Sequence, residues 1–290
     1  RNCNSLETLD TSSFNNSKVL TVESMFYKCS ALKKIDLSGF DFSSLDFEKT
    51  DMEDIDTLGL KECTALEEIK CPKNVKVTNS YNPKQQYTLP YVEGKIWIDK
   101  NENMYDVLPE NLSESITLTL VDGASYVLAS GTSGEIQWEL CADGNLTVTG
   151  QGDFKEKYDT DWGDVIDIRT IPWKGYEEKI IKATVSVTGM TDASELFSGC
   201  KNLKEVNLTD FDASEVTTMR SMFNSCSSLT DINLSGLDTT NVTDMSYMFS
   251  SCYQLSEVDF GMFNTNNVTN MTWMFAYCQA LDNLDVSGFD

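Results

Sequence analysis

Hydrophobic residues recur in the second half of the chain at a fixed interval of 26 positions. A fixed period of roughly 20–50 residues is the signature of a solenoid, in which each unit buries its apolar side against the next. We therefore predict stacked units with a continuous core. The matching positions form four columns: Cys200, Cys226, Cys252 and Cys278; Phe197, Phe223, Phe249 and Phe275; Leu203, Leu229, Leu255 and Leu281; and Val216, Val242 and Val268.

Within one unit the spacing of the apolar positions changes. Ile232 and Leu234 alternate with polar residues, which indicates a short strand. Residues 238–241 are of the types that cap the start of a helix, and residues 242–252 place apolar side chains at spacings of three and four, as along one helix face. Each unit is therefore predicted to be a strand, a turn and a short helix, which makes the fold α/β.

The repeated pattern reads M-F-x-x-C-x-x-L-x-x-[IVL]-x-L-S-x-F-D-x-x-x-V-x-x-M. It resembles the 26-residue repeat of BspA-type leucine-rich-repeat bacterial surface proteins, and the resemblance covers about half of the chain. It implies a leucine-rich-repeat solenoid that is displayed outside the cell, at the bacterial surface. It also implies contact with components of host or neighbouring cells.

Interruptions of the period divide the chain into four segments. Within the first of them, the acidic residues 46–54 lengthen one unit. A solenoid end exposes its core and needs a cap, so we interpret the aperiodic middle as two caps. Both outer ends fall inside a unit, and we expect the chain to be a section of a longer protein. The four segments are array one at 1–72, a β-rich C-terminal cap and linker at 73–128, a β-rich N-terminal cap at 129–190 and array two at 191–290.

The two caps are predicted from β-branched and aromatic runs between turn residues. In the first cap, residues 96–98 and 116–120 indicate strands. In the second, residues 131–134 are typical of a linker, and residues 136–148 indicate a strand–turn–strand hairpin around an Asp-Gly turn. The pattern W-x-L-x-x-x-G-x-L-x-V-x-G-x-G in this hairpin is similar to the segment that precedes the repeats in the BspA-type family.

Composition and charge exclude several classes of function. The formal charge is −24, from 46 Asp and Glu against 22 Lys and Arg. This charge argues against nucleic acid and anionic membranes and favours neutral or basic partners. Histidine is absent, which excludes Ser–His and Cys–His catalytic sites and His metal sites. No apolar stretch reaches about 18 residues, so we expect no direct membrane insertion.

The cysteines hold a repeated position and do not suggest a disulfide framework. Six of the nine share one repeat position, and Cys63 fits it as well. Such placement predicts a ladder of buried, free thiols, because a stack offers the facing geometry of a disulfide poorly.

One stretch has the oxygen spacing of an EF-hand calcium loop. Asp99, Asn101, Asn103 and Glu110 supply the oxygens, but Met104 stands where the loop needs glycine. The flanking residues look like paired strands and not like helices. We therefore predict a polar hairpin turn here, with a calcium site as the less favoured alternative, and expect no metal and no cofactor.

The candidate binding surface is the outward face of the strands in array two, because solenoids commonly bind through a stacked face. Five of its eight positions are acidic, none is basic, and residues 221–290 contain no Lys or Arg. Two interpretations stay open, a solvated polar face and a binding face that prefers a basic partner. The eight positions are Glu205, Asn207, Asp231, Asn233, Glu257, Asp259, Asn283 and Asp285.

The sequence thus predicts a non-enzymatic binding or adhesion module whose strand face contacts a protein or glycan on host or neighbouring cells. Two other classes stay open. Open solenoid ends could associate head to tail, which would make the chain a structural subunit of an extracellular fibre. The remaining enzymatic route is a hydrolase with a carboxylate pair, since Asp and Glu are abundant.

Overall fold

The computed structural model describes residues 2–14, 19, 22, 24–42, 58–73, 75, 87–159, 165–168, 170–261, 263–287 and 289. The acidic insertion predicted at 46–54 lies outside these residues. The chain divides into two compact units, Arg1–Gly123 and Ala124–Asp290. In the described part of the chain, no helix has the length and apolar character needed to cross a bilayer.

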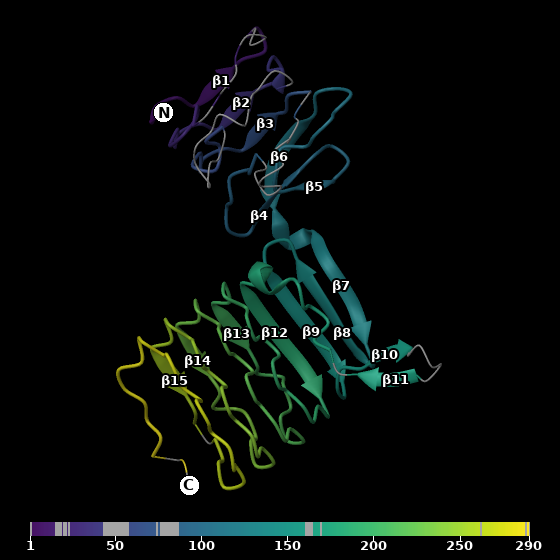
Figure 1. Ribbon diagram of the computed structural model, residues 1–290, viewed down its shortest axis with the longest axis vertical. Coiled ribbons are helices and arrows are strands. Elements are labelled where there is room, and N and C mark those ends of the chain that lie inside the picture. Colours follow the sequence, from purple (N-terminus) through teal and green to yellow (C-terminus); the bar gives the residue numbers. More distant parts are fainter. Residues whose placement is uncertain are drawn as a thin grey trace. The chain divides into compact units, whose positions relative to one another are not determined.

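The N-terminal unit is built on a six-stranded sheet (Figure 1). Its first three strands are parallel and in register, so Leu9, Ile35 and Ile69 lie side by side. Ile69 is also paired with Leu118 of the antiparallel strand β6, and both side chains are fully buried. The sheet order is β1-β2-β3-β6-β4-β5, with β1 (Thr8–Asp10), β2 (Lys34–Asp36), β3 (Glu68–Lys70), β4 (Lys95–Ile98), β5 (Met104–Tyr105) and β6 (Thr117–Asp122).

The C-terminal unit begins with an antiparallel meander and continues as parallel strands (Figure 1). The 3-10 segment η3 (Gly123–Ser125) includes the last residue of the N-terminal unit, and η4 (Glu177–Lys179) belongs to the C-terminal unit. We call residues 182–290 the C-terminal stack. One sheet has the strand order β13-β12-β9-β8-β7, and two further sheets are the pairs β14–β15 and β10–β11. The strands of this unit are β7 (Val127–Ser133), β8 (Ile136–Cys141), β9 (Asn145–Gln151), β10 (Glu156–Asp159), β11 (Val165–Ile168), β12 (Lys182–Thr188), β13 (Glu205–Asn207), β14 (Asp231–Asn233) and β15 (Glu257–Asp259).

Several strand predictions are confirmed and one linker prediction is wrong. Residues 96–98 fall in β4, and residues 116–120 largely coincide with β6. The hairpin over 136–148 forms between β8 and β9, and Gly144 in its turn has φ +86°, a conformation that glycine adopts without strain. The predicted linker at 131–134 instead belongs to β7, which pairs with β8 as far as Ser133 and turns at Gly134.

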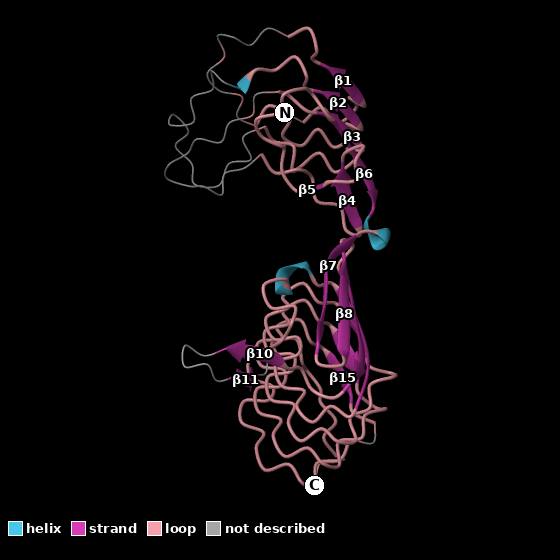
Figure 2. Ribbon diagram, turned by 90° about the vertical axis from the view of Figure 1, so that its right-hand side faces the viewer, coloured by secondary structure: helices cyan, strands magenta, loops and turns pink. Residues whose placement is uncertain are grey.

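The α/β prediction, with one short helix per unit, is also wrong. The described residues contain no α-helix, and turns follow one another where the helix was expected. In the layer of residues 242–252, Tyr247 and Ser251 have φ values of +59° and +64°, which no right-handed helix contains. In the C-terminal unit the strands of the layers lie on one side and the turns on the other, where the β10–β11 pair also lies (Figure 2).

Hydrogen bonds between layers explain why these segments are not helices. The N–H groups of Ser221 and Phe223 donate across to the carbonyls of Ser246 and Met248, each at 2.9 Å. The N–H of Asn224, the next residue along the chain, donates back to Ser221 at 3.1 Å. A helix would require every N–H for the carbonyl four residues earlier. Each turn is closed by a hydrogen bond between residues three apart, as from Cys226 to Phe223. Consecutive turns of this kind bring residues three apart to one side, so the apolar spacing resembles that of a helix.

Aromatic rings stack through the core of the C-terminal stack, one from each layer. The ring centroids of Phe197 and Phe223 lie 5.5 Å apart, as do those of Phe223 and Phe249, and those of Phe249 and Phe275 lie 5.7 Å apart. Trp173 stacks on Phe197 at 6.4 Å, and its indole N–H donates to the Leu196 carbonyl at 2.9 Å. The column of rings therefore continues into Trp173, which also occupies a backbone acceptor of the first layer.

Candidate binding face of the strands

The strand positions singled out in the sequence all lie at the surface. Glu205, Asp231 and Glu257 are the first residues of β13, β14 and β15, and the third residues of these strands are Asn207, Asn233 and Asp259. Asn283 and Asp285 occupy the same offsets in the next layer without forming a strand. All eight are exposed, while the central residue of each strand, such as Ile232, faces the core.

The register of the strands brings like charges together. Asp231 is paired with Glu257, and Asn233 with Asp259. At the other end of the face, Glu205 is paired with Lys182 of β12, and their side chains form an ion pair at 3.1 Å. Among the described residues, no ion pair neutralises Asp231 or Glu257. The uncompensated negative charge is therefore concentrated on β14 and β15.

The third strand position has a structural role that the sequence analysis missed. Its side-chain oxygen accepts a hydrogen bond from the backbone N–H two residues later and so closes the turn that follows the strand. The signal was present, since a Ser, Thr or Gly stands two residues after each of these positions. The bonds are Thr209 N–H to Asn207 (3.0 Å), Ser235 N–H to Asn233 (2.9 Å), Gly261 N–H to Asp259 (3.0 Å) and Ser287 N–H to Asp285 (2.9 Å).

Other Asp side chains of the C-terminal stack close turns in the same way. The Asp212 carboxylate accepts from the Ser214 N–H and that of Asp238 from the Thr240 N–H, both at 3.0 Å. The side-chain and backbone hydrogen bonds from Ser214 and Thr240 hold the pKa values of these two carboxyls below their ordinary value. A lowered folded-state pKa means that each turn stabilises the fold above the unfolded-state pKa, about 3.9, and loses that contribution as the pH falls through the folded value.

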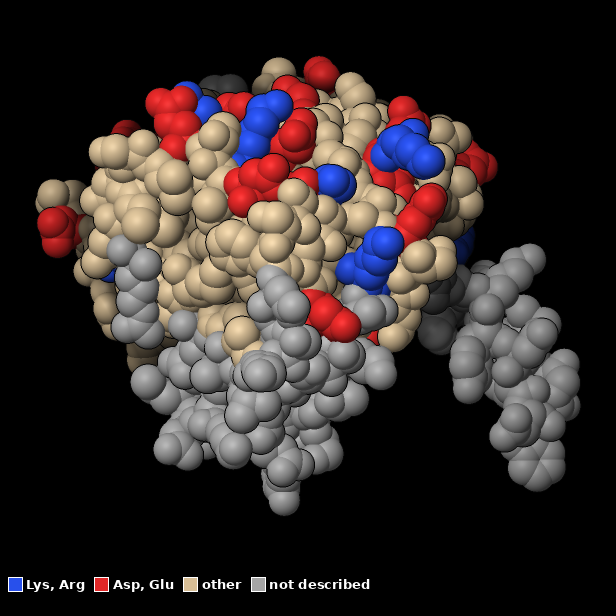
Figure 3. Space-filling view, turned by 90° about the horizontal axis from the view of Figure 1, so that it is seen from above, with Lys and Arg blue, Asp and Glu red and all other residues tan. Residues whose placement is uncertain are grey.

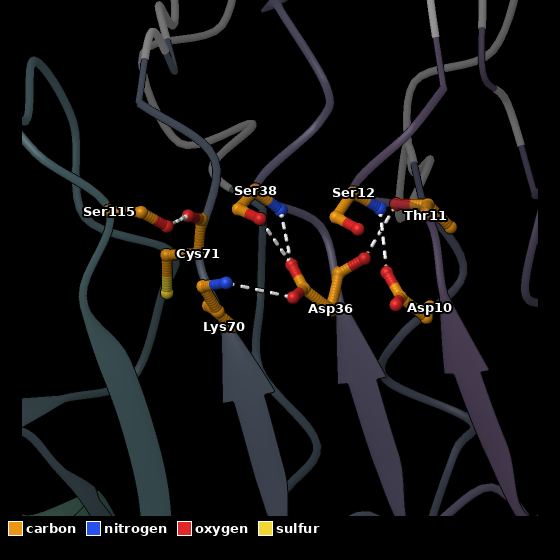
Figure 4. A network of polar contacts seen from close by, with 8 residues as sticks. All are labelled: Asp10, Thr11, Ser12, Asp36, Ser38, Lys70, Cys71 and Ser115. Carbon is orange, nitrogen blue, oxygen red and sulfur yellow. Dashed lines mark hydrogen bonds and ion pairs between the residues drawn. The ribbon is translucent and has the colours of Figure 1, made fainter.

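The strand face of the N-terminal unit has a different charge balance. Lys34 pairs with Glu68 at 3.2 Å and Lys70 with Asp36 at 2.9 Å, each across neighbouring strands. Figure 4 shows that Ser38 and Lys70 both contact the Asp36 carboxylate. Burial raises the pKa of the Asp36 carboxyl, but hydrogen bonds from Ser38 and Lys70 outweigh it and lower the pKa. In the view from above, acidic and basic side chains lie next to one another (Figure 3).

The cysteines are free thiols, as predicted, and four of them donate to a backbone carbonyl of the preceding layer. The Cys226 thiol donates to the Phe197 carbonyl and the Cys252 thiol to the Phe223 carbonyl, both at 3.1 Å. Burial raises the pKa of Cys252 to about 12, so its thiolate, the reactive form, is absent near neutral pH. Cys3 departs from the predicted burial, because it is exposed.

The candidate calcium loop is a closed hairpin turn. Its flanking strands β4 and β5 pair through Trp97 and Tyr105, which confirms the predicted polar turn. The Asp99 carboxylate accepts the N–H of Asn101 at 2.8 Å and that of Asn103 at 3.0 Å, while its second oxygen accepts the Asn103 amide and the Tyr105 hydroxyl. Both oxygens therefore serve the turn. Over the described ranges, no group of three or more Cys, Asp or Glu side chains is placed to hold a metal ion.

The fold and this face define a class of repeat protein, in which layers of the chain stack through core columns and present polar strand residues outward. Residues 1–57 and 187–290, more than half of the chain, match the family described as "Mycoplasma protein of unknown function, DUF285". The chain belongs to this family. No curated protein matches it.

Two solved structures are similar to parts of the chain. A leucine-rich repeat protein from Eubacterium ventriosum is 20% identical, with 55% of this chain and 45% of that chain covered and a TM-score of 0.32. A leucine rich cell surface protein from Faecalibacterium prausnitzii is 21% identical, with 53% and 54% covered and a TM-score of 0.25. The chain thus spans about half the length of each, and likenesses at these TM-scores decide nothing about function.

Proposed function

We propose that the protein is a non-enzymatic binding module of a bacterial cell surface, and that the outward face of β14 and β15 binds a basic segment of a partner protein. One observation carries the proposal. Ion pairs between layers neutralise strand positions of β2 and β3 in the N-terminal unit, whereas the facing pair Asp231 and Glu257 on β14 and β15 is left acidic. The surface location rests on the sequence resemblance to BspA-type proteins.

Folding does not require the acidic pair on β14 and β15. Like charges directly opposite each other on neighbouring strands are mildly destabilising. The N-terminal unit places Lys34 opposite Glu68 in the same parallel arrangement, so the fold accommodates a compensated pair. Neither Asp231 nor Glu257 closes a turn, in contrast to the third strand position. Their charge is therefore available to a ligand without opening a turn, although the Asp231 carboxylate also accepts the Thr230 hydroxyl at 2.8 Å.

Complementary charge gives such a face a defined mode of recognition. A basic segment would be attracted at long range, would associate fast and would bind more weakly as salt rises. Lysine and arginine side chains would replace the missing cations opposite Asp231 and Glu257. The partner class is therefore a Lys- or Arg-rich protein surface on a host or neighbouring cell.

Binding of an oligolysine peptide, measured by calorimetry at low and at physiological ionic strength, tests this proposal. The double variant Asp231→Asn/Glu257→Gln removes the two uncompensated charges and leaves every turn acceptor in place. We expect it to bind the peptide about tenfold more weakly. Its thermal stability should be unchanged or slightly higher, because the like-charge pair is gone.

The matched control is Asp212→Asn/Asp238→Asn, which also removes two carboxylates and keeps a side-chain oxygen for each turn. This control should bind the peptide nearly as well as the unchanged protein. Equal weakening in both variants would show that only the net charge matters, and the assignment to the strand face would then be wrong.

A further inference from the structure

We propose that the turn side of the C-terminal stack carries a second binding surface, an aromatic strip of Tyr247, Trp273 and Tyr277 that binds a neutral polysaccharide chain. This surface is separate from the acidic strands and does not depend on the function proposed for them. The three residues belong to the turns that occupy the place of the predicted helices, whereas the acidic positions belong to the strands on the other side of the unit (Figure 2).

The three rings contact one another across two layers, with interplanar angles of 43° between Tyr247 and Trp273 and 73° between Trp273 and Tyr277, so each ring presents its own face or edge. The ring centroids of Tyr247 and Trp273 lie 5.9 Å apart, and those of Trp273 and Tyr277 lie 6.3 Å apart. Trp273 is 57% exposed and Tyr277 59%, and Tyr247 is half-buried. The Arg220 guanidinium lies 5.1 Å from the centre of the Tyr247 ring and donates to the Ser246 hydroxyl at 2.9 Å, which continues the strip into the preceding layer.

The backbone at these positions disfavours large side chains. Tyr247, Trp273 and Tyr277 have φ values of +59°, +56° and +62°. A left-handed backbone costs a residue with a Cβ about 1–2 kcal/mol, and bulky residues are uncommon there. The corresponding positions of earlier layers are also at positive φ, and they hold Glu195, Ser221, Gly199, Ser225 and Ser251.

Residues without an aromatic ring therefore satisfy the fold at these positions. Because these rings are largely exposed, they gain only part of the hydrophobic stabilisation that full burial in a core would give them. When folding does not require a bulky residue at a position with an unfavourable backbone conformation, its presence there points to a functional role. The strip then serves contact with a ligand.

The chemistry of the strip fits a neutral polysaccharide. The face of an aromatic ring is negative, so it attracts the C–H groups on the flat side of a sugar ring, and successive rings can hold successive sugars. Tyrosine hydroxyls, the Trp273 indole N–H and the exposed Thr272 hydroxyl supply hydrogen-bonding groups for sugar hydroxyls. Anionic chains are disfavoured, because no Lys or Arg follows Arg220 in the sequence and the chain has a formal charge of −24.

Affinity electrophoresis of the full chain in native gels tests the assignment, with hydroxyethylcellulose as a β-glucan probe and glycogen as an α-glucan probe. At least one probe should retard the unchanged protein. Trp273→Ala should lose at least about tenfold in affinity, as expected for a central aromatic contact. Tyr247→Ser introduces the residue of an earlier layer, so it should weaken retardation without loss of stability.

Two control variants test whether retardation belongs to this strip and to no other part of the surface. Tyr253→Ala removes a 46%-exposed aromatic residue outside the strip and should leave retardation unchanged. Asp231→Asn/Glu257→Gln should also bind the glucan normally, so the two proposals fail independently. No retardation by either probe would overturn the inference, as would full retardation of Trp273→Ala. Binding of polyproline in place of glucan, abolished by Trp273→Ala, would overturn it in favour of a peptide surface.

Discussion

The strand faces of the two units share their turns but not their charges. In both, an Asp or Asn at the strand end accepts the N–H two residues later, as Asp36 does from Ser38 and Asn233 from Ser235. In the N-terminal unit Lys34 faces Glu68, whereas in the C-terminal stack Asp231 faces Glu257. Turn chemistry is thus common to both layered folds, and charge balance is free to vary. A functional difference between the units is therefore to be sought in the charge.

The largest expected effect tests whether the aromatic column holds the C-terminal stack together. Phe223→Ala removes a fully buried ring that stacks on Phe197 and Phe249. The loss of packing and the cavity should reduce the free energy of unfolding by about 3–5 kcal/mol. Denaturant unfolding measures the loss, and hydrogen exchange should place it in the C-terminal stack and leave the N-terminal unit protected.

The matched control is Phe14→Ala in the N-terminal unit, where the ring is 47% exposed and contacts Phe40. This change should reduce the free energy of unfolding by about 1 kcal/mol or less. If Phe223→Ala were as mild as this control, the layers would be held by backbone hydrogen bonds and not by the column.

A smaller effect concerns the thiol ladder, which links one layer to the next. Cys226→Ala removes the hydrogen bond to the Phe197 carbonyl and leaves a small cavity. The Phe197 carbonyl keeps the Cys200 N–H as a donor at 3.0 Å, so the cost should be only about 1–2 kcal/mol. Thermal unfolding measures this cost, and Cys3→Ala, a change at an exposed thiol, serves as the control.

Thiol labelling of the folded protein should follow burial. Cys3 is exposed and should react first, and Cys226 and Cys252 should react only after unfolding. Labelling of Cys226 in the folded protein at the rate of Cys3 would contradict the ladder.

The smallest expected effect is that of salt on stability, which should have opposite signs in the two units. At about 1 M salt the screening length is about 3 Å, so the repulsion between Asp231 and Glu257 should weaken. This loss of repulsion should stabilise the C-terminal stack by a few tenths of a kcal/mol. The exposed ion pairs of the N-terminal unit, each worth about 0–1 kcal/mol, should weaken under the same conditions.

Salt also screens the net charge of the whole chain, so the salt response of each single variant is compared with that of the unchanged protein. Asp231→Asn should reduce the salt-dependent gain of the C-terminal stack, and Lys34→Gln should reduce the salt-dependent loss of the N-terminal unit. The same salt response in both variants and in the unchanged protein would remove the contrast between the two faces.

Sequence patterns predicted the buried columns and the strands well. Alternation at Ile232 and Leu234 corresponds to a strand, and both side chains are buried. The thiols are free, and the hairpin over 136–148 is where the turn residues placed it. The helix prediction failed at 242–252, because spacings of three and four arise from consecutive tight turns as well as from a helix.

The sequence by itself determined which side chains enter the core, since burial follows from apolar character and from the interval of 26 residues. It did not determine the backbone between the strands, because the N–H groups there bond to the next layer, and a local pattern carries no information about such partners. The same is true of the ion pair between Lys34 and Glu68 and of the rings of Tyr247 and Trp273. These contacts join residues from different layers, and only the stacking of the layers decided which of them meet.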